Sequence, residues 1–365
     1  MQKKLIALAV AGAAAGFAAP VFAQSTVTVY GVVDVGIESS KFSDAAGTLT
    51  RMITSGNTTN RLGFKGSEDL GNGMKANFML ETQPYPDVGT AGSGSAGNSN
   101  FWHRTSTLGL SSASWGSVNL GSQYTPWFSA RAANDIFYVA GVGSNYTNFE
   151  RSNTRISNSI RYDSASYNGF SMAAAYGFGQ AAGYDTQEGQ TAATKKLGQL
   201  TGLNLAYANG PMALRYGFEK YQTAQGPDVN NKANTINGSY DFQVVKAVAG
   251  WASFKNDGVG GAPATIDEKS WYIGAVVPVF GKDLVKAEYS RLKDNTATAA
   301  TGSKDAKMIS IGYEHPMSKR TTLYATYAKL NNDSGASRTF LSDNAVGVAA
   351  GFDPSAFQMG LKHSF

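Results

Sequence analysis

The chain has 365 residues, a formal net charge of +5 and no cysteine, and it is rich in glycine (42), phenylalanine (19) and tyrosine (18) with only 10 prolines. The lack of cysteine excludes a disulfide-stapled scaffold, and the composition is that of one large all-β protein. Two of the positive charges belong to Lys3 and Lys4, and the remaining charge of about +3 is too small and too dispersed to indicate nucleic acid as a partner.

The first residues have the pattern of a secretory signal peptide. The first four residues are basic in character, residues 5–19 form a short apolar run, and Ala23 is the small residue expected before a cleavage site. A transmembrane helix would need about 20 apolar residues, but Pro20 ends the run early. We therefore expect residues 1–23 to be removed and residues 24–365 to form a single exported domain.

Runs of alternating apolar and polar residues recur from Thr26 to the end of the chain. Turns such as Asn168-Gly169 supply the positive φ angles that tight hairpins require, and long polar loops are expected over residues 39–59 and 124–154. Short turns on one side and long loops on the other are typical of an outer-membrane barrel with an even number of strands. The sixteen predicted strands lie at residues 26–37, 60–68, 74–83, 103–111, 117–123, 155–163, 170–178, 199–208, 212–221, 233–242, 245–255, 268–277, 283–293, 305–314, 321–330 and 355–365.

The alternation also predicts which face of each strand meets an apolar medium. In residues 27–35 the odd positions are apolar, while Thr28 and Asp34 lie on the other face. A soluble β-sandwich would show the same alternation. The number of strands without a domain break and the aromatic strand ends, such as Trp271 and Phe357, favour a membrane barrel instead.

Four segments of this chain resemble the trimeric general porins of Gram-negative outer membranes, most closely their beta-proteobacterial branch. They are residues 26–34 (TVTVYGVVD), residues 60–73 (NRLGFKGSEDLGNG), residues 121–126 (GSQYTP) and the terminal Phe365. The resemblance implies a sixteen-stranded antiparallel transmembrane β-barrel that forms a homotrimer among outer-membrane lipids, including lipopolysaccharide. It also implies that the third long loop folds into the lumen. Phe365 would be the signal that the barrel assembly machinery reads, on a last strand that closes the sheet against the first.

Selectivity in a pore resides in charged side chains at its narrowest point. Alternation places Arg61 and Lys65 on the inner face of their strand, and Arg155 and Arg161 on the inner face of theirs. Arg104 matches a basic position in the family's fourth strand, but alternation alone does not settle which way it faces. By the resemblance, arginines of this set form the basic side of a pore constriction.

The long loop supplies the acidic residues that would lie opposite these arginines, Asp135 and Glu150. Family loops of this kind often carry an acidic Pro-Glu-Phe-Gly-Gly element. Here the chain reads PWFSAR over residues 126–131, so this acid is missing and Arg131 follows. A surplus of basic residues at a constriction raises the local concentration of anions, and we therefore expect the pore to prefer anions.

Chemistry at a catalytic or metal site has little support in the sequence. The histidines, His103, His315 and His363, have no second ligand at metal-binding spacing, and no compact grouping of serine, histidine and aspartate is visible. We expect a passive channel for small hydrophilic solutes and ions, without a cofactor, a metal or enzymatic turnover. The alternatives are a ligand-specific channel or receptor for a sugar or an organic anion, and a barrel enzyme acting on lipids.

Overall fold

The computed structural model describes residues 26–43, 47–92, 100–150, 152–179, 198–222, 230–257, 264–340 and 348–365. The predicted signal peptide, residues 1–23, lies outside this set. In the described part of the chain, no helix has the length and hydrophobicity needed to cross a bilayer.

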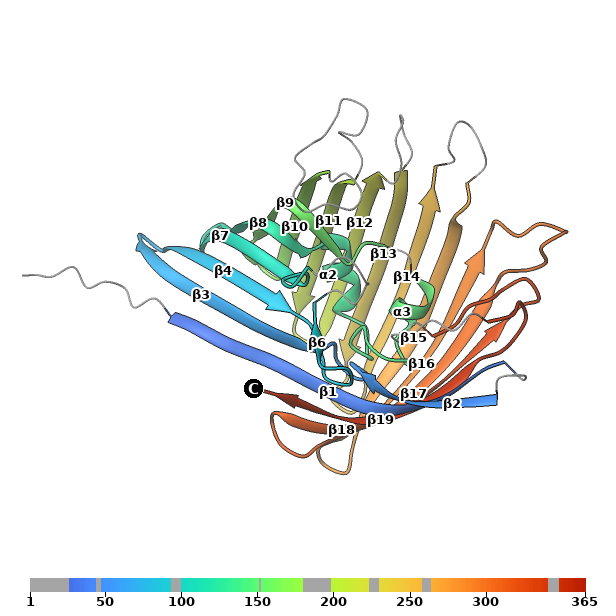
Figure 1. Cartoon of the computed structure of the whole chain (residues 1–365). Helices are drawn as coiled ribbons and strands as arrows, with labels where there is room; N and C mark the ends of the chain where they lie inside the picture. The colour runs from blue at the N-terminus through green and yellow to red at the C-terminus, as the bar shows by residue number, and fades with distance from the viewer. Residues whose placement is uncertain are drawn as a thin grey trace, which may run out of the picture.

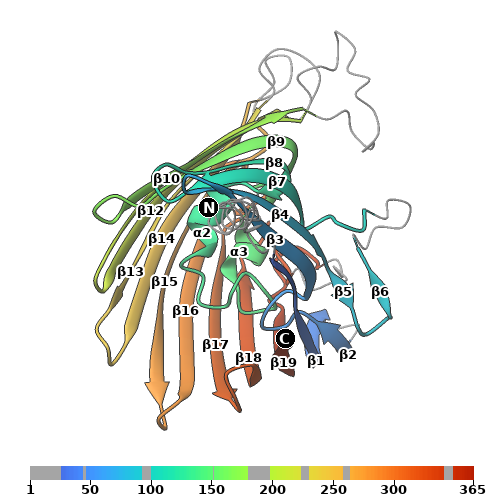
Figure 2. The same ribbon diagram turned by 90° about the vertical axis from the view of Figure 1, so that its left-hand side faces the viewer.

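Sixteen antiparallel strands close into a single barrel, in which each strand pairs with the next and the last pairs with the first (Figures 1 and 2). The predicted fold is therefore confirmed. The sixteen barrel strands are β1 (Thr26–Ser43), β3 (Arg61–Gly71), β4 (Met74–Thr82), β7 (Thr105–Ser112), β8 (Gly116–Tyr124), β9 (Arg155–Ser164), β10 (Phe170–Phe178), β11 (Gln199–Asn209), β12 (Met212–Gln222), β13 (Asn230–Asp241), β14 (Lys246–Asn256), β15 (Asp267–Val279), β16 (Asp283–Asp294), β17 (Ala306–Pro316), β18 (Thr321–Asn332) and β19 (Ser355–Ser364).

The loop predicted over residues 39–59 is largely strand, so that prediction is wrong. β1 continues to Ser43, and an extra strand, β2 (Gly47–Thr54), pairs with its second half, while β3 pairs with its first half. β2 and β3 thus share one side of β1 with a break between them. The sequence concealed β2 because its run GTLTRMIT contains few apolar residues. Outside the barrel wall, β5 (Pro84–Tyr85) pairs with β6 (Thr90–Ala91).

The break between β2 and β3 is held by a buried carboxylate on β1. Asp34 accepts hydrogen bonds from the backbone N–H groups of Asn57 (2.8 Å) and Thr58 (2.7 Å) and from the Tyr324 hydroxyl (2.7 Å). Its own N–H donates to the Asn60 side chain at 2.6 Å. Buried polar groups of an interrupted strand need such partners because water does not reach them.

The two faces of the strands have the polarity that a bilayer outside and a polar lumen require. On β1, Val27 and Val29 are 63% and 54% exposed on the outer face, whereas Asp34 and Glu38 are fully buried inside. This arrangement is the reverse of a soluble sandwich, whose apolar residues face inward. The apolar residues of β1 thus belong on the lipid side.

Closure of the barrel places the last residue against a glycine of the first strand. Gly31 and Phe365 exchange two backbone hydrogen bonds of 3.1 Å. A Cβ on Gly31 would lie 2.4 Å from Cζ of the Phe365 ring and 2.7 Å from the Arg61 carbonyl oxygen. The ring therefore covers a position that has to remain without a side chain, in the manner of an aromatic residue shielding a strand glycine.

We expect Gly31→Val to lower the yield of folded barrel strongly, because the new side chain displaces both the Phe365 ring and the β3 backbone. The measurement is the fraction of heat-modifiable barrel on unheated gels after refolding in detergent. Val33→Ala, a change at an outward residue of the same strand, serves as the control and should leave the yield nearly unchanged. Equal yields of Gly31→Val and wild type would contradict this account of closure.

A long loop between β8 and β9 folds back inside the barrel (Figure 2). This lumen loop (residues 125–154) contains two short helices, α2 (Pro126–Ala132) and α3 (Asn145–Phe149). Thr125 starts α2 by accepting the Phe128 N–H at 3.1 Å. Inside the barrel, Trp127 packs against Phe254 of β14 with ring centroids 5.6 Å apart. The entry of the third long loop into the lumen agrees with the expectation.

Glycines on the inner wall allow the lumen loop to approach the strands closely. A Cβ on Gly202 would lie 2.9 Å from Pro126 Cδ, and one on Gly217 would lie 3.0 Å from Ala130 Cβ. Two more such positions follow along the wall, because a Cβ on Gly274 would meet Ile136 at 3.0 Å and a Cβ on Gly312 would meet Phe137 at 2.8 Å. We call Gly202, Gly217, Gly274 and Gly312 the glycine seats. Because they lie on β11, β12, β15 and β17, the loop packs along that side of the barrel.

Candidate functional site

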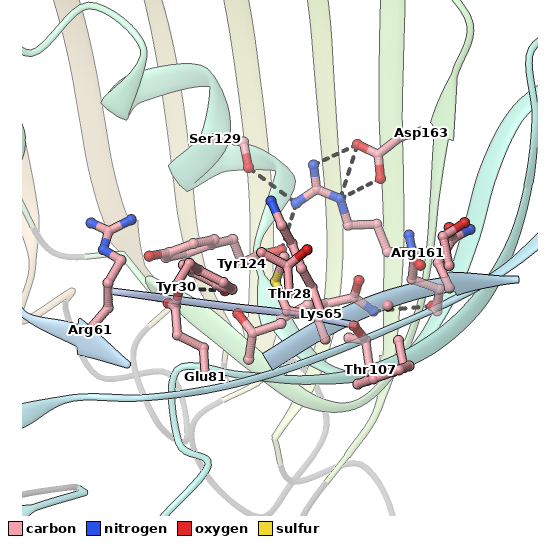
Figure 3. A pocket seen from close by; sticks show the side chains of 18 of the residues that line it. Thr28, Tyr30, Arg61, Lys65, Glu81, Thr107, Tyr124, Ser129, Arg161 and Asp163 are labelled. Atoms are coloured by element: carbon pink, nitrogen blue, oxygen red, sulfur yellow. Dashed lines mark hydrogen bonds and ion pairs between the residues drawn. The ribbon is translucent and has the colours of Figure 1, made fainter. Parts of the chain in front are cut away.

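The lumen loop leaves a cavity of about 760 Å³ on the side of the barrel formed by β1, β3, β4, β7, β8 and β9 (Figure 3). One side chain of α2, Ser129, reaches this cavity from the loop. The charged side chains that line it are Arg61, Lys65, Glu81, Arg161 and Asp163.

Arg104 and Arg155 meet at the hydroxyl group of Tyr124. Arg104 Nη2 lies 2.7 Å and Arg155 Nη2 lies 2.9 Å from this oxygen, and the Arg155 guanidinium stacks 4.4 Å from the centroid of the Tyr124 ring. Arg104 is buried and also forms an ion pair of 2.7 Å with Glu81, which in turn accepts the Tyr30 hydroxyl at 2.9 Å. The facing of Arg104, which alternation left open, is thus toward Glu81 and Tyr124. Four strands contribute to one charged network.

Arg61 and Lys65 differ from Arg161, the other basic residue that lines the cavity, because neither has a carboxylate partner within the described residues. Arg61 Nε donates to the Thr59 carbonyl at 3.3 Å, and Lys65 Nζ lies 5.2 Å from the centroid of the Tyr30 ring. Both line the cavity, and Lys65 is exposed. Their charges are therefore open to solutes in the channel.

Arg161 lies between a neighbouring carboxylate and the lumen loop (Figure 3). Its guanidinium group forms an ion pair with Asp163, with Nη2 and Oδ1 2.6 Å apart. Nη1 donates to the Tyr124 carbonyl at 2.7 Å and to the Ser129 hydroxyl at 3.1 Å. Arg161 consequently ties α2 to the barrel wall, and Asp163 is its carboxylate partner.

The two loop acids are not placed opposite the arginines. Glu150 forms an ion pair of 2.7 Å with Arg131, and both side chains are almost completely buried. Asp135 accepts the Phe137 N–H at 2.8 Å and the Ser144 hydroxyl at 2.6 Å. Neither carboxylate lines the cavity. Both interact with other residues of the lumen loop, including Arg131, which packs against the barrel wall.

Arg131 is the centre of this buried group. Its guanidinium stacks 4.2 Å from the centroid of the Tyr272 ring, donates to the side chain of Asn145, and interacts electrostatically with Glu288 of β16 as well as with both loop acids. Burial raises the pKa of Glu150, and the charge of Arg131 opposes that rise. Arg131 follows the position where the family's loop acid is missing, and the structure buries its side chain against the barrel wall.

Sequence reasoning did not include Tyr30, Glu81, Tyr124 and Asp163 among the site residues. Two of them carried a usable signal, because Glu81 and Asp163 share the inner face of their strands with other polar residues and lie near predicted arginines. The contact between Tyr124 and two arginines depends on how β7, β8 and β9 are aligned, which no local pattern gives.

His103 lies next to this network, and the surrounding positive charges shift its pKa. Burial, together with the positive charges of Arg155 and Arg104, lowers the pKa of His103 to about 4. An unfolded chain would protonate this residue near 6.5. Between these values the unfolded chain binds a proton that the folded barrel does not, so the stability contributed by neutral His103 falls as the pH falls through this window.

We therefore expect His103→Asn to weaken the acid sensitivity of the barrel. The midpoint of thermal unfolding should drop less between pH 7 and pH 4 in the variant than in the wild type, with little difference between the two proteins at pH 7. His363→Asn, a change at an exposed residue of β19, serves as the matched control. Identical pH profiles for wild type and His103→Asn would refute this explanation.

Comparison with known proteins agrees with this architecture. A family model described as Gram-negative porin matches residues 7–335. The chain is 35% identical over 379 residues to outer membrane porin protein 32 of Delftia acidovorans, with complete coverage of both sequences. The anion-selective porin from Comamonas acidovorans superimposes with a TM-score of 0.78 at 30% identity, covering 94% of this chain and 100% of that one. OmpT of Vibrio cholerae in a trimer form has a TM-score of 0.69 at 16% identity, covering 93% and 99% of the two chains, and supports the fold alone.

A barrel of sixteen strands whose lumen holds a folded loop beside a charged cavity defines an outer-membrane pore protein. The chain belongs to the Gram-negative porin family. Its relatives are outer-membrane porins, so its location in the outer membrane and the resemblance to beta-proteobacterial porins are both confirmed.

Proposed function

We propose that this porin conducts small hydrophilic solutes and ions by passive diffusion through the cavity beside the lumen loop, with a preference for anions. The observation that carries the proposal is the charge of the site. Arg61 and Lys65 are unpaired within the described residues, whereas the carboxylates Glu81 and Asp163 are each bound to an arginine. The solved relative from Comamonas acidovorans, described as anion-selective, supports the same preference.

The physical basis is the field of fixed charges beside a narrow aqueous space. Arg104, Arg155 and Arg161 add their charges to those of Arg61 and Lys65, and low-dielectric walls concentrate the field lines in the lumen. The acids of the loop contribute little opposing field, because Glu150 is neutralised by Arg131 and Asp135 is held by hydrogen bonds behind the loop. Anions are thus attracted and cations are partly excluded.

We also infer how the chain is processed and with what it associates in the outer membrane. We propose cleavage after Ala23, which N-terminal sequencing of the protein from outer membranes would test. We further propose a homotrimer surrounded by lipid that includes lipopolysaccharide, with Phe365 read by the barrel assembly machinery, and a channel without enzymatic turnover. The trimer form of the Vibrio cholerae protein supports the oligomeric state as a property of the fold.

The experiment that tests the function is the zero-current potential of purified protein in a planar bilayer separating two KCl concentrations. We expect a stable conductance with the sign that indicates chloride preference, and a smaller preference at high salt because the field is screened. A potassium preference would overturn the charge assignment while keeping the channel. Block of the conductance that saturates with the concentration of a sugar or an organic anion would favour a ligand-specific channel.

A further inference from the structure

Two basic residues lie on the inner wall between the lumen loop and the short turns, outside the cavity that holds Arg61 and Lys65. They are Arg215 on β12 and Lys362 on β19, and we call them the vestibule cations. Both side chains are half-buried. Because β19 is the seventh strand after β12 in a barrel of sixteen, the two residues project from nearly opposite sides of the lumen.

Neighbouring residues on β12 show that Arg215 faces the lumen. Gly217 is one of the glycine seats, so this position points toward the lumen loop. Glu219, two residues further along, accepts the backbone N–H of Asn153 in that loop at 3.0 Å. Alternate residues of a strand share a face, so Arg215 points the same way. It lies about 7 Å from Gly217 toward the short turn that precedes β12, and therefore beyond α2.

The same reasoning places Lys362 in the lumen. The side chain of Gln358, four residues earlier on β19, accepts the Val142 N–H of the lumen loop at 3.3 Å. Lys362 shares this face and lies about 13 Å nearer the short turns. Its Nζ is 5.6 Å from the centroid of the Tyr138 ring. The ammonium group is thus beside the lumen loop, on its short-turn side.

Neither vestibule cation has a charged partner in contact among the described residues. Arg215 makes no hydrogen bond or ion pair there, and Lys362 has only its contact with the Tyr138 ring. Asp34 lies directly opposite Lys362 in register. Its carboxylate, however, already accepts three hydrogen bonds from other groups. Both positive charges are therefore open to ions in the lumen.

The other charges on this part of the described inner wall, apart from Lys65 at the cavity, occur in pairs of opposite sign. Two of the pairs are ion pairs, and in the other two the residues lie directly opposite each other in register. The pairs are Lys286 with Glu314, Arg161 with Asp163, Asp69 with Lys75, and Asp241 with Lys246. The vestibule cations thus leave a net positive charge between the lumen loop and the short turns.

We propose that Arg215 and Lys362 form a second stage of selection for small anions, between the cavity and the short-turn mouth of the pore. The inference rests on the proposed diffusion of ions through the lumen. A unit charge about 10 Å from an ion, screened over about 10 Å at 0.1 M salt, changes the local ratio of anions to cations by about 1.7-fold. Two such charges change it by about threefold. At 1 M salt the screening length is about 3 Å, and the stage is silent.

The test is the zero-current potential of full-length porin in a planar bilayer, with KCl at about 0.1 M on one side and about 1 M on the other. Every protein carries Ser166→Cys in the short turn between β9 and β10, which is exposed. Because the chain has no other cysteine, an impermeant thiol reagent added to one side identifies the orientation of the barrel.

We expect the double variant Arg215→Gln, Lys362→Gln to lower the permeability ratio of chloride to potassium about threefold when the dilute solution is on the short-turn side. With the dilute solution on the long-loop side, the ratio should hardly change. Lys362→Gln alone should lower the ratio about 1.7-fold in the first orientation, so the test does not depend on the folding of the double variant. The charge-conserving variant Arg215→Lys, Lys362→Arg should keep the wild-type ratio.

The matched control is Lys282→Gln with Lys319→Gln, which removes two charges from exposed short turns at the same end of the barrel. It should leave the ratio unchanged. An equal fall in this control, an equal fall in both orientations, or no fall in the double variant would overturn the inference. A wild-type pore that prefers potassium would refute the proposed anion preference instead, and the orientation-dependent fall in the double variant would still identify the second stage.

Discussion

Replacing Arg61 and Lys65 together by glutamate is expected to reverse the ion preference of the pore. These two side chains are the basic residues of the cavity without a carboxylate partner among the described residues, and Lys65 is exposed to the lumen. The double change would leave Arg104, Arg155 and Arg161 facing a larger number of carboxylates. A unit charge about 6 Å from a permeating ion contributes about 0.7 kcal/mol even in a water-like dielectric.

Because each replacement removes a positive charge and adds a negative one, we expect the permeability ratio of chloride to potassium to fall about tenfold or more at low salt. The measurement is again the zero-current potential under a KCl gradient. The matched control is Lys319→Glu with Arg320→Glu, which makes the same charge change in an exposed short turn. Equal shifts in both variants would show that net charge, rather than the lining of the cavity, sets the preference.

Replacement of Arg104 would be a poor test of ion preference. Its guanidinium is buried against Glu81 and bonded to Tyr124, so its removal leaves a buried carboxylate without its partner and damages the wall itself. A change in selectivity would then be inseparable from a change in structure. Among the described residues, Arg61 makes a single long hydrogen bond, to the Thr59 carbonyl, and its replacement leaves the network around Arg104 intact.

The second large effect is expected from Arg131→Met. Arg131 is fully buried, forms an ion pair with Glu150, and also interacts with Asp135 and Glu288. The Glu288 carboxylate oxygens have no hydrogen-bond partner among the described residues. The positive charge of Arg131 is therefore the main interaction that stabilises the Glu288 carboxylate. Removing one member of a buried ion pair costs about 3–5 kcal/mol.

We expect Arg131→Met to release the lumen loop from the wall while leaving the strand pairing intact. Single-channel recordings should show a larger and noisier conductance, and proteolysis should cleave within residues 125–154 of the folded barrel. The double variant Arg131→Met, Glu150→Gln should recover part of the wild-type behaviour, since it removes both charges of the pair. A quiet, wild-type conductance in the single variant would show that the glycine seats and aromatic contacts hold the loop unaided.

The sequence was a good guide to the barrel and a partial guide to the site. Alternation is a local property, so it revealed the strands, the outward valines of β1 and the inward Arg61 and Lys65. It failed for β2, where the outward residues are too few to mark a strand, and at the break that Asp34 stabilises. In both places the structure depends on contacts between distant parts of the chain.

Pairing between charges was likewise beyond sequence reasoning. Asp135 and Glu150 carry the right charge to face the arginines, but Arg131 lies in the same loop and binds Glu150 instead. Residue type and spacing cannot tell whether a carboxylate of a folded loop faces the channel or the wall. A change in the backbone conformation of the loop reverses the direction in which the side chain points. The alignment of three strands likewise decides the meeting of Arg104 and Arg155 at Tyr124.

The glycine seats affect how the apertures of related pores can differ. They bring the lumen loop to the wall by the absence of side chains on β11, β12, β15 and β17, on the side away from the charged cavity. A change from glycine to alanine or serine at one seat would move the loop by a few tenths of an ångström without altering any charge. Under the proposed anion preference, the aperture and the charge preference would be set on opposite sides of the lumen, so that selection could adjust the size limit for solutes while conserving the preference for their charge.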